Sequence, residues 1–275
     1  MTCRARVAGW SRRVSDTWER GDPYEQYVGR WSRRVAPVFL SWLRIPAGRR
    51  WVDVGCGTGA LCAAIADTCA PASVAGVEPS EGFLETARDN LAGRAVLHQG
   101  SATAIPLDDA SVDVVVSGLV LNFVADQRAA LAEMVRVTRR GGVIAAYVWD
   151  YAAKMELIRF FWDAAVALDP RAATMDEGAR FPLCCPEALA ALFAGAGLPG
   201  PRVTGIVVPT SFASFEDYWR PFLGGQGPAP SYAMSLGEEA RARLRDRLRA
   251  RITPEPDGSI LMIARAWAIR ATVPG

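Results

Sequence analysis

The stretch that decides the fold is Trp51-Val52-Asp53-Val54-Gly55-Cys56-Gly57-Thr58-Gly59-Ala60. A short apolar run ends in an acid, and three alternate glycines follow it. Glycine adopts backbone angles that a Cβ forbids and lets the backbone approach a ligand closely. Residues 60–70 are apolar, alanine-rich and compatible with a helix, whose first N–H groups have no partners inside the helix. The stretch therefore predicts a buried strand that turns sharply into a helix and holds an adenosine-containing cofactor.

The glycines alone do not identify that cofactor. The pattern Gly55-x-Gly57-x-x-Ala60 satisfies the dinucleotide fingerprint, and Glu78 ends the next apolar run, where an acid would bind ribose hydroxyls. NAD and S-adenosylmethionine both fit these features. The charge of Asp53 gives a partial reason to prefer S-adenosylmethionine, because a pyrophosphate disfavours a nearby carboxylate, whereas an ammonium and a sulfonium favour one.

Five blocks, in order, resemble the motifs of class I S-adenosylmethionine-dependent methyltransferases. They are Val52–Gly59, Gly76–Ser80 followed by Phe83 and Leu84, Gln99–Pro106, Val112–Ser117, and Arg139–Gly142 before an apolar strand. In the third block Ser101 stands where the family usually carries Asp, and in the last Arg140 stands in a proline position. The resemblance covers roughly residues 24–150 and is close to the ubiquinone and menaquinone methyltransferases.

The resemblance implies that the cofactor is S-adenosylmethionine, with S-adenosylhomocysteine as the product. Glu78 would hold the ribose, and Phe83 would cover the adenine. Tyr27 and Arg30 would close over the methionine end, although core packing and a surface position suit these two residues equally well. The implied cofactor-binding residues are Tyr27, Arg30, Asp53, Gly55, Cys56, Gly57, Glu78, Pro79, Phe83, Ser101, Ala102 and Ser117.

The chain reads as alternating strands and helices, which predicts a doubly wound α/β sheet. By resemblance it has seven mostly parallel strands, the last antiparallel, with a helical N-terminal cover and a helical, aromatic substrate cap. Predicted strands lie at 50–54, 73–78, 95–99, 112–117, 143–149, 203–208 and 259–269. Predicted regions are an N-terminal cover (1–45), a cofactor-binding core (46–150) and the sheet's completion (151–275), with cap insertions at about 151–197 and 209–235.

The second half carries clusters of large aromatic side chains around Gly/Pro-rich breaks. Such clusters usually form core, but here they also suit a mobile lid at 209–235 over an apolar acceptor pocket. Asn122 cannot act as a base but can orient an acceptor oxygen, and Asp150 is a weak base candidate. The predicted substrate contacts are Asn122, Trp149, Tyr151 and Trp219.

Composition limits the other classes. Net charge is +2, and the six arginines of 238–251 alternate with acids and leucines at helical spacing, which favours an exposed helix face over a nucleic-acid patch. One histidine and six cysteines without a C-x-x-C pair predict no metal site. The sequence shows neither a signal peptide nor a run of 18 uncharged apolar residues, so we expect a cytoplasmic protein without a membrane span. The oligomeric state is not readable.

The predicted function is methyl transfer from S-adenosylmethionine to a small, largely apolar or aromatic organic acceptor, such as a secondary metabolite or a quinone-like molecule. One alternative is a cyclase or decarboxylase that keeps the cofactor without transferring its methyl group. A second is an NAD-dependent reductase, although Tyr151-x-x-Lys154 is one residue too short for the Tyr/Lys pair of short-chain dehydrogenases. A third is a non-catalytic binding protein.

Overall fold

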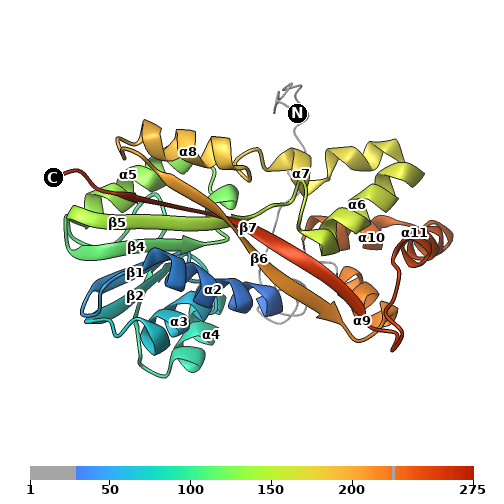
Figure 1. Ribbon diagram of the computed structural model, residues 1–275, viewed down its shortest axis with the longest axis horizontal. Helices are drawn as coiled ribbons and strands as arrows, with labels where there is room; N and C mark the ends of the chain where they lie inside the picture. Colours follow the sequence, from blue (N-terminus) through green and yellow to red (C-terminus); the bar gives the residue numbers. More distant parts are fainter. Residues whose placement is uncertain (1–28, 225–226) are drawn as a thin grey trace.

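The computed structural model describes residues 29–224 and 227–275, except the side chain of Arg30 (Figure 1). The strands are β1 (Arg50–Val54), β2 (Ser73–Glu78), β3 (Val96–Gln99), β4 (Val112–Gly118), β5 (Thr138–Trp149), β6 (Arg202–Phe212) and β7 (Ile260–Thr272). The α-helices are α2 (Arg30–Leu43), α3 (Ala60–Thr68), α4 (Glu81–Leu91), α5 (Gln127–Val137), α6 (Glu156–Leu168), α7 (Glu177–Arg180), α8 (Pro186–Gly195), α9 (Phe215–Trp219), α10 (Pro228–Ser235) and α11 (Glu238–Arg251). Short 3₁₀ turns are η2 (Leu121–Phe123), η3 (Pro170–Thr174) and η4 (Arg220–Leu223).

The seven strands form one sheet in the order β3-β2-β1-β4-β5-β7-β6, and β7 runs antiparallel to both of its neighbours. This arrangement confirms the predicted doubly wound α/β fold. The strands β1 and β4 are buried almost throughout, as their continuous apolar sequences require between two helix layers. The helices α5 and α8 cover one face of the sheet, and α2, α3 and α4 cover the other (Figure 1).

The last two strands are longer than predicted. The ladder between β6 and β7 runs from Arg202 opposite Arg270 to Phe212 opposite Ile260, well past the end of β5. The strand continues through Pro209 because β6 is an edge strand, where a residue without an N–H is tolerated. Residues 209–212 therefore belong to β6, and the predicted cap segment of 209–235 was wrong in its first four residues.

The cap packs around the extended end of the β6–β7 pair, beyond the carboxyl ends of the parallel strands (Figure 1). Its core is aromatic: Phe161 of α6 stacks on Phe222 with ring centroids 4.5 Å apart. The Tyr218 hydroxyl donates to the Leu157 carbonyl at 3.1 Å, which ties the segment after β6 to α6. The aromatic residues that the sequence analysis placed in the cap therefore form much of its own core.

No helix in the described ranges is both long and apolar enough to cross a membrane.

Candidate functional site

The glycine turn joins β1 to α3, and its three glycines differ in the space around them. All three have positive φ: +77° at Gly55, +53° at Gly57 and +86° at Gly59. A Cβ on Gly55 would lie 2.6 Å from the side chain of Val120, and one on Gly59 would lie 2.9 Å from Leu91. A Cβ on Gly57 would meet nothing within 4 Å. Two glycines thus permit close packing, while the third leaves open space beside the turn.

A cavity of about 140 Å³ lies at this turn, at the carboxyl ends of β1, β2, β4 and β5. Ligands of open α/β sheets bind at this edge. The wall consists of Ser32, Asp53, Gly55, Cys56, Gly57, Thr58, Ala60, Leu61, Glu78, Phe83, Gly118, Leu119, Val120, Phe123 and Tyr147. The structure therefore brings six of the predicted cofactor residues together, three of them from the turn itself: Asp53, Gly55, Cys56, Gly57, Glu78 and Phe83.

Glu78 ends β2 and faces the glycine turn. Its Oε2 accepts from the Gly57 N–H at 3.1 Å, and its Oε1 accepts from the Ser80 N–H at 3.1 Å. Burial raises the pKa of this carboxyl, and the two backbone N–H groups partly offset that effect. The carboxylate is thus fixed in place beside Gly57, in a position to accept hydrogen bonds from a bound diol.

Asp53 lines the cavity and is almost fully buried. Its Oδ2 accepts a weak hydrogen bond from Cys62 Sγ at 3.5 Å, while Oδ1 has no hydrogen-bond partner among the described residues. Burial raises the pKa of this carboxyl from 3.8 to about 7, and the nearby charge of Glu78 adds to the rise. A buried acid with a free oxygen at a cavity wall is suited to a cationic ligand.

The other predicted cofactor residues lie outside this wall. Ser117 is fully buried and donates to the Val54 carbonyl at 2.8 Å, so its side chain ties β4 to β1, and the next residue, Gly118, lines the cavity instead. A contact of Ser117 with the cofactor therefore stays a prediction. Pro79, Ser101 and Ala102 lie beyond the wall on the β3 side, with Ser101 Oγ 2.8 Å from Thr103 Oγ1.

Tyr27 lies outside the described residues, and so does the side chain of Arg30. Neither prediction is therefore tested. The neighbouring Ser32 on α2 does line the cavity, and its hydroxyl donates to the Gly29 carbonyl at 2.7 Å.

The chain after β4 makes a sharp turn at the cavity. Leu119 has φ +63°, an unfavourable conformation for a bulky residue. The turn packs Val120 against Gly55 and buries Asn122 in η2. Both polar atoms of the Asn122 amide lack hydrogen-bond partners within the described part of the chain. Asn122 does not line the cavity, although Phe123 beside it does.

The remaining predicted substrate residues are buried around the cap. Phe181 connects Tyr151 to the cavity wall. Its ring centroid lies 5.5 Å from that of Tyr151 and 5.1 Å from that of Phe123, which lines the cavity. Trp149 is buried at the end of β5, and Trp219 packs against Phe222 at 5.8 Å inside the cap. These three predicted residues do not belong to the wall of the cavity at the glycine turn.

Asp150 is held in an ion pair rather than left available as a base. Arg265 Nη2 lies 2.6 Å from its Oδ2, and the Lys154 N–H donates to the same oxygen at 3.1 Å. The carboxylate is buried. Protonating it would weaken its ion pair with the Arg265 guanidinium. This ion pair joins the end of β5 to β7, and a role of Asp150 as a base stays a prediction.

Tyr147 is one of the wall residues that the sequence analysis missed. It lies within an apolar run of β5 and reads there as core, and its ring does pack on Phe39 at 4.7 Å. Its position opposite Gly118 brings it to the cavity. No local pattern could have shown this, because it depends on how β4 and β5 are aligned.

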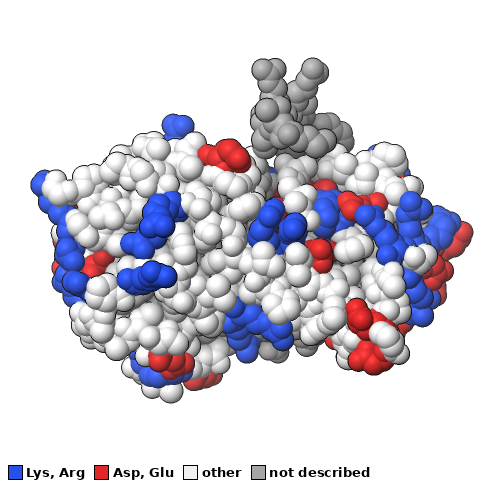
Figure 2. Space-filling model, in the orientation of Figure 1, with Lys and Arg blue, Asp and Glu red and all other residues white. Residues whose placement is uncertain are grey.

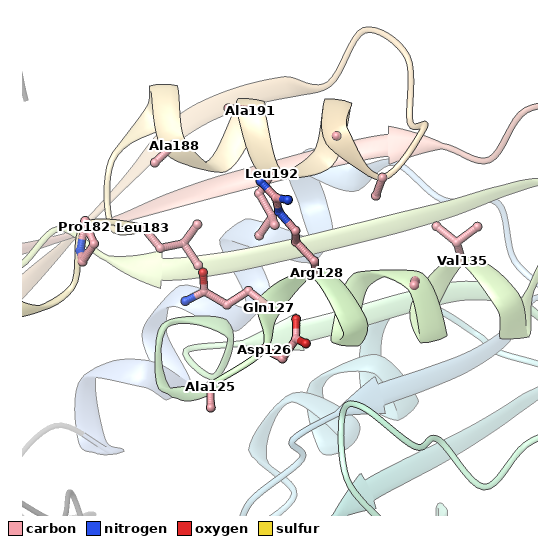
Figure 3. A pocket seen from close by; sticks show the side chains of 13 residues that line it. Ala125, Asp126, Gln127, Arg128, Val135, Pro182, Leu183, Ala188, Ala191 and Leu192 are labelled. Carbon is pink, nitrogen blue, oxygen red and sulfur yellow. The ribbon is translucent and has the colours of Figure 1, made fainter. Parts of the chain in front are cut away.

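A larger cavity, of about 770 Å³, lies elsewhere, between α5 and α8 (Figure 3). Its wall is mostly small and apolar, with Asp126, Gln127 and Arg128 at the start of α5. Asp126 is engaged there in accepting from the Ala129 N–H at 2.9 Å. This groove thus contains neither the glycine turn nor the two buried acids.

The surface charges are mixed. On the face shown in Figure 2, basic and acidic side chains lie interspersed. Three arginines of α11 pair with acids: Arg243 with Glu239, Arg249 with Glu216, and Arg251 with Asp163. These pairs fit the predicted exposed helix face. Within the described ranges, no three His, Cys, Asp or Glu side chains gather as metal ligands.

Part of the chain is similar to known methyltransferases. Residues 52–146 match the family model described as a methyltransferase domain. A demethylmenaquinone methyltransferase of Clavibacter sepedonicus is 39% identical over 115 residues, which are 41% of this chain and 43% of that protein. The chain thus matches less than half the length of this relative.

Solved structures share the fold. The YcgJ protein of Bacillus subtilis superposes with a TM-score of 0.57 at 18% identity, covering 90% of this chain and 99% of that one. Phosphoethanolamine N-methyltransferase 2 of Haemonchus contortus, solved with S-adenosylhomocysteine, gives a TM-score of 0.57 at 15% identity, covering 96% of this chain and 58% of that one. The predicted resemblance is confirmed: residues 52–146 match a methyltransferase domain, and these solved structures share the fold.

Proposed function

We propose that this protein transfers a methyl group from S-adenosylmethionine to a small, largely apolar or aromatic organic acceptor. The observation that carries the proposal is the unpartnered Oδ1 of buried Asp53 in the cavity at the glycine turn. The methyl donor carries a sulfonium and an ammonium, and either cation would offset the desolvation of this carboxylate. NAD would instead bring a pyrophosphate to the same turn.

The residues present fit the donor in further ways. Glu78, fixed by the Gly57 and Ser80 N–H groups, offers a carboxylate for the ribose hydroxyls. Phe83 supplies an apolar surface at the same wall for the adenine. When bound, the donor supplies an electrophilic methyl group on its sulfonium.

The acceptor would be bound between the cavity and the cap. The rings of Phe123, Phe181 and Tyr151 form a continuous aromatic path from the cavity wall towards the cap. The buried Asn122 amide adds a donor and an acceptor of hydrogen bonds next to Phe123, and Trp149 and Trp219 complete the proposed acceptor side. The similarity to a demethylmenaquinone methyltransferase supports a quinone-like acceptor.

The chain's contribution to the reaction is mainly positional. With Asp150 paired to Arg265, no proposed site residue is placed as a general base. Holding the acceptor atom and the methyl group in line, about 3–3.5 Å apart, supplies much of the acceleration in such reactions. This mode of action suits an acceptor that is already nucleophilic at neutral pH.

Two measurements test the proposal. Calorimetry with S-adenosylmethionine, S-adenosylhomocysteine and NAD should show binding of the first two and none of NAD. Incubation of the protein with methyl-labelled S-adenosylmethionine and a panel of hydroxynaphthoquinones and phenols should then label one of them. Binding without labelling of any metabolite, in the panel or in cell extracts, would favour a cyclase or decarboxylase. NAD binding would indicate a reductase, and failure to bind any of the three would indicate a non-catalytic protein.

A further inference from the structure

Two cysteine thiols lie together at the glycine turn. Cys56 belongs to the turn and lines the cavity, whereas Cys62 lies in the first turn of α3 and is fully buried. The chain between them is compact, because the Gly59 N–H donates to the Cys56 carbonyl at 2.8 Å and the Ala63 N–H donates to the Gly59 carbonyl at 2.9 Å. Both cysteines are free thiols.

The two sulfurs pack against adjacent residues of β2. Cys56 Sγ lies beside Gly76, where a Cβ would be 2.8 Å from it. Cys62 Sγ donates weakly to the carbonyl of Ala75, the residue before Gly76, at 3.9 Å. A hydrogen bond between the two thiols, together with burial, raises the pKa of Cys62 above its usual range. Cys56 and Cys62 are therefore direct neighbours in space.

The two cysteines differ in their access to small molecules. Cys56 lines the cavity and keeps 6% of its surface exposed, whereas Cys62 has none exposed. A reversible thiol switch needs such a pair, in which an oxidant reaches one cysteine and the other resolves the product. An acid also stands beside the second thiol, because Cys62 Sγ donates to Asp53 Oδ2 at 3.5 Å.

We propose that hydrogen peroxide converts Cys56 and Cys62 to a reversible disulfide that turns off binding of the methyl donor. In the first step one peroxide oxygen is transferred to the Cys56 thiol, which becomes a sulfenic acid, and the other oxygen leaves as water. In the second step the Cys62 sulfur attacks the Cys56 sulfur. Asp53 accepts the Cys62 proton, and the sulfenic hydroxyl leaves with a proton as a second water. The two thiols lose two electrons and two protons, and the peroxide is reduced to two waters.

The disulfide changes the contacts of both buried acids at the cavity. It holds the two sulfurs about 2 Å apart, so both side chains leave the positions that they occupy as thiols. Cys62 then no longer donates to Asp53. The movement of Cys56 also displaces Gly57, whose N–H donates to Glu78 Oε2 at 3.1 Å. The effect on donor binding rests on the proposed function of these acids, whereas formation of the disulfide does not.

Mass spectrometry tests the disulfide itself. Cleavage before aspartates gives residues 53–66, which contain Cys56 and Cys62, and residues 67–88, which contain Cys69. After peroxide treatment and alkylation of the remaining thiols, peptide 53–66 should carry no alkyl group and should be lighter by two hydrogen atoms. Dithiothreitol should restore both thiols. Overturning results would be a peptide that gains oxygen atoms instead, or one that keeps both thiols up to the peroxide dose that oxidises the exposed Met234.

Three variants test the order of the two steps. Cys62→Ser keeps a hydrogen-bond donor beside Asp53 but cannot close the disulfide, so dimedone should trap the sulfenic acid on Cys56. In Cys56→Ser the buried Cys62 should remain a thiol and form no dimedone adduct. Cys69→Ala, a cysteine outside the cavity wall, is the matched control and should form the disulfide as the wild type does. Absence of the adduct on Cys56, or an adduct on Cys62, would contradict the proposed steps.

Calorimetry with S-adenosylhomocysteine connects the disulfide to the site. The oxidised wild type should bind this ligand about 10-fold or more weakly than the reduced protein, as expected for a disturbed bond to a charged group, and dithiothreitol should restore the affinity. Equal affinities of the two forms would overturn the switch and leave the proposed function intact. A reduced protein that does not bind S-adenosylhomocysteine would overturn the proposed function and the switch together, while the peptide masses would still decide whether the disulfide forms.

Discussion

Replacing Asp53 by Asn is expected to stabilise the ligand-free protein and to weaken its binding of S-adenosylmethionine. The buried carboxyl has a pKa of about 7 in the folded protein against its usual 3.8, so the unfolded chain ionises at lower pH than the folded one. Below pH 3.8 the two states are protonated alike. As the pH rises to 7, the folded state loses stability relative to the unfolded state.

The magnitude follows from the same two pKa values. Their difference corresponds to a loss of about 4 kcal/mol in the free energy of unfolding, complete above pH 7. An amide at this position does not ionise, but leaving its polar atoms unpartnered costs about 1–3 kcal/mol. Asp53→Asn should therefore stabilise the ligand-free protein by about 1–3 kcal/mol at pH 8, and the gain should shrink as the pH falls towards 5.

Urea unfolding of both proteins at several pH values between 5 and 8 measures this effect. Asp246→Asn, on the exposed side of α11, is the control and should change the free energy of unfolding by less than about 0.5 kcal/mol. Calorimetry should show that the wild type binds S-adenosylmethionine more tightly as the pH rises from 6 to 8, and that Asp53→Asn binds about 10-fold or more weakly at pH 8 with little pH dependence. A stability difference between the variants that is independent of pH would refute the reasoning about burial. Equal affinity of the two proteins at pH 8 would refute the role of Asp53 in binding the cation.

Three further predictions concern the turn, the ribose and the cap. Glu78→Ala should weaken S-adenosylmethionine binding by about 2–3 kcal/mol in calorimetry, and an unchanged dissociation constant would reject the ribose assignment. Gly55→Ala should lower the free energy of unfolding more than Gly48→Ala does. Both residues have positive φ, but the new Cβ meets the Val120 side chain only at Gly55. Equal losses in urea unfolding would contradict this. Trp219→Ala should lower acceptor turnover while calorimetry shows nearly unchanged cofactor affinity, and a parallel loss of both would show that the cap supports the whole site rather than the acceptor side.

The sequence by itself determined the features that depend on neighbouring residues. The glycine turn, Asp53 before it and Glu78 at the end of the next strand could be read directly, because a strand–turn–helix unit is set by local backbone preferences and parallel strands place their carboxyl ends at one edge. The alternation of strands and helices determined the fold class for the same reason.

The tertiary structure decided what depends on register and on partners far apart in the chain. Tyr147 reaches the cavity because β5 is aligned so that it lies opposite Gly118, and a shift by one residue would turn its side chain to the other face of the sheet. Asp150 is paired with Arg265, which lies 115 residues further along the chain, and no local pattern indicates that partner. Pro209 continues a strand because β6 lies at the sheet edge, where a missing N–H leaves no broken ladder. Local spacing determines backbone shape, whereas the alignment of distant strands determines which side chains meet.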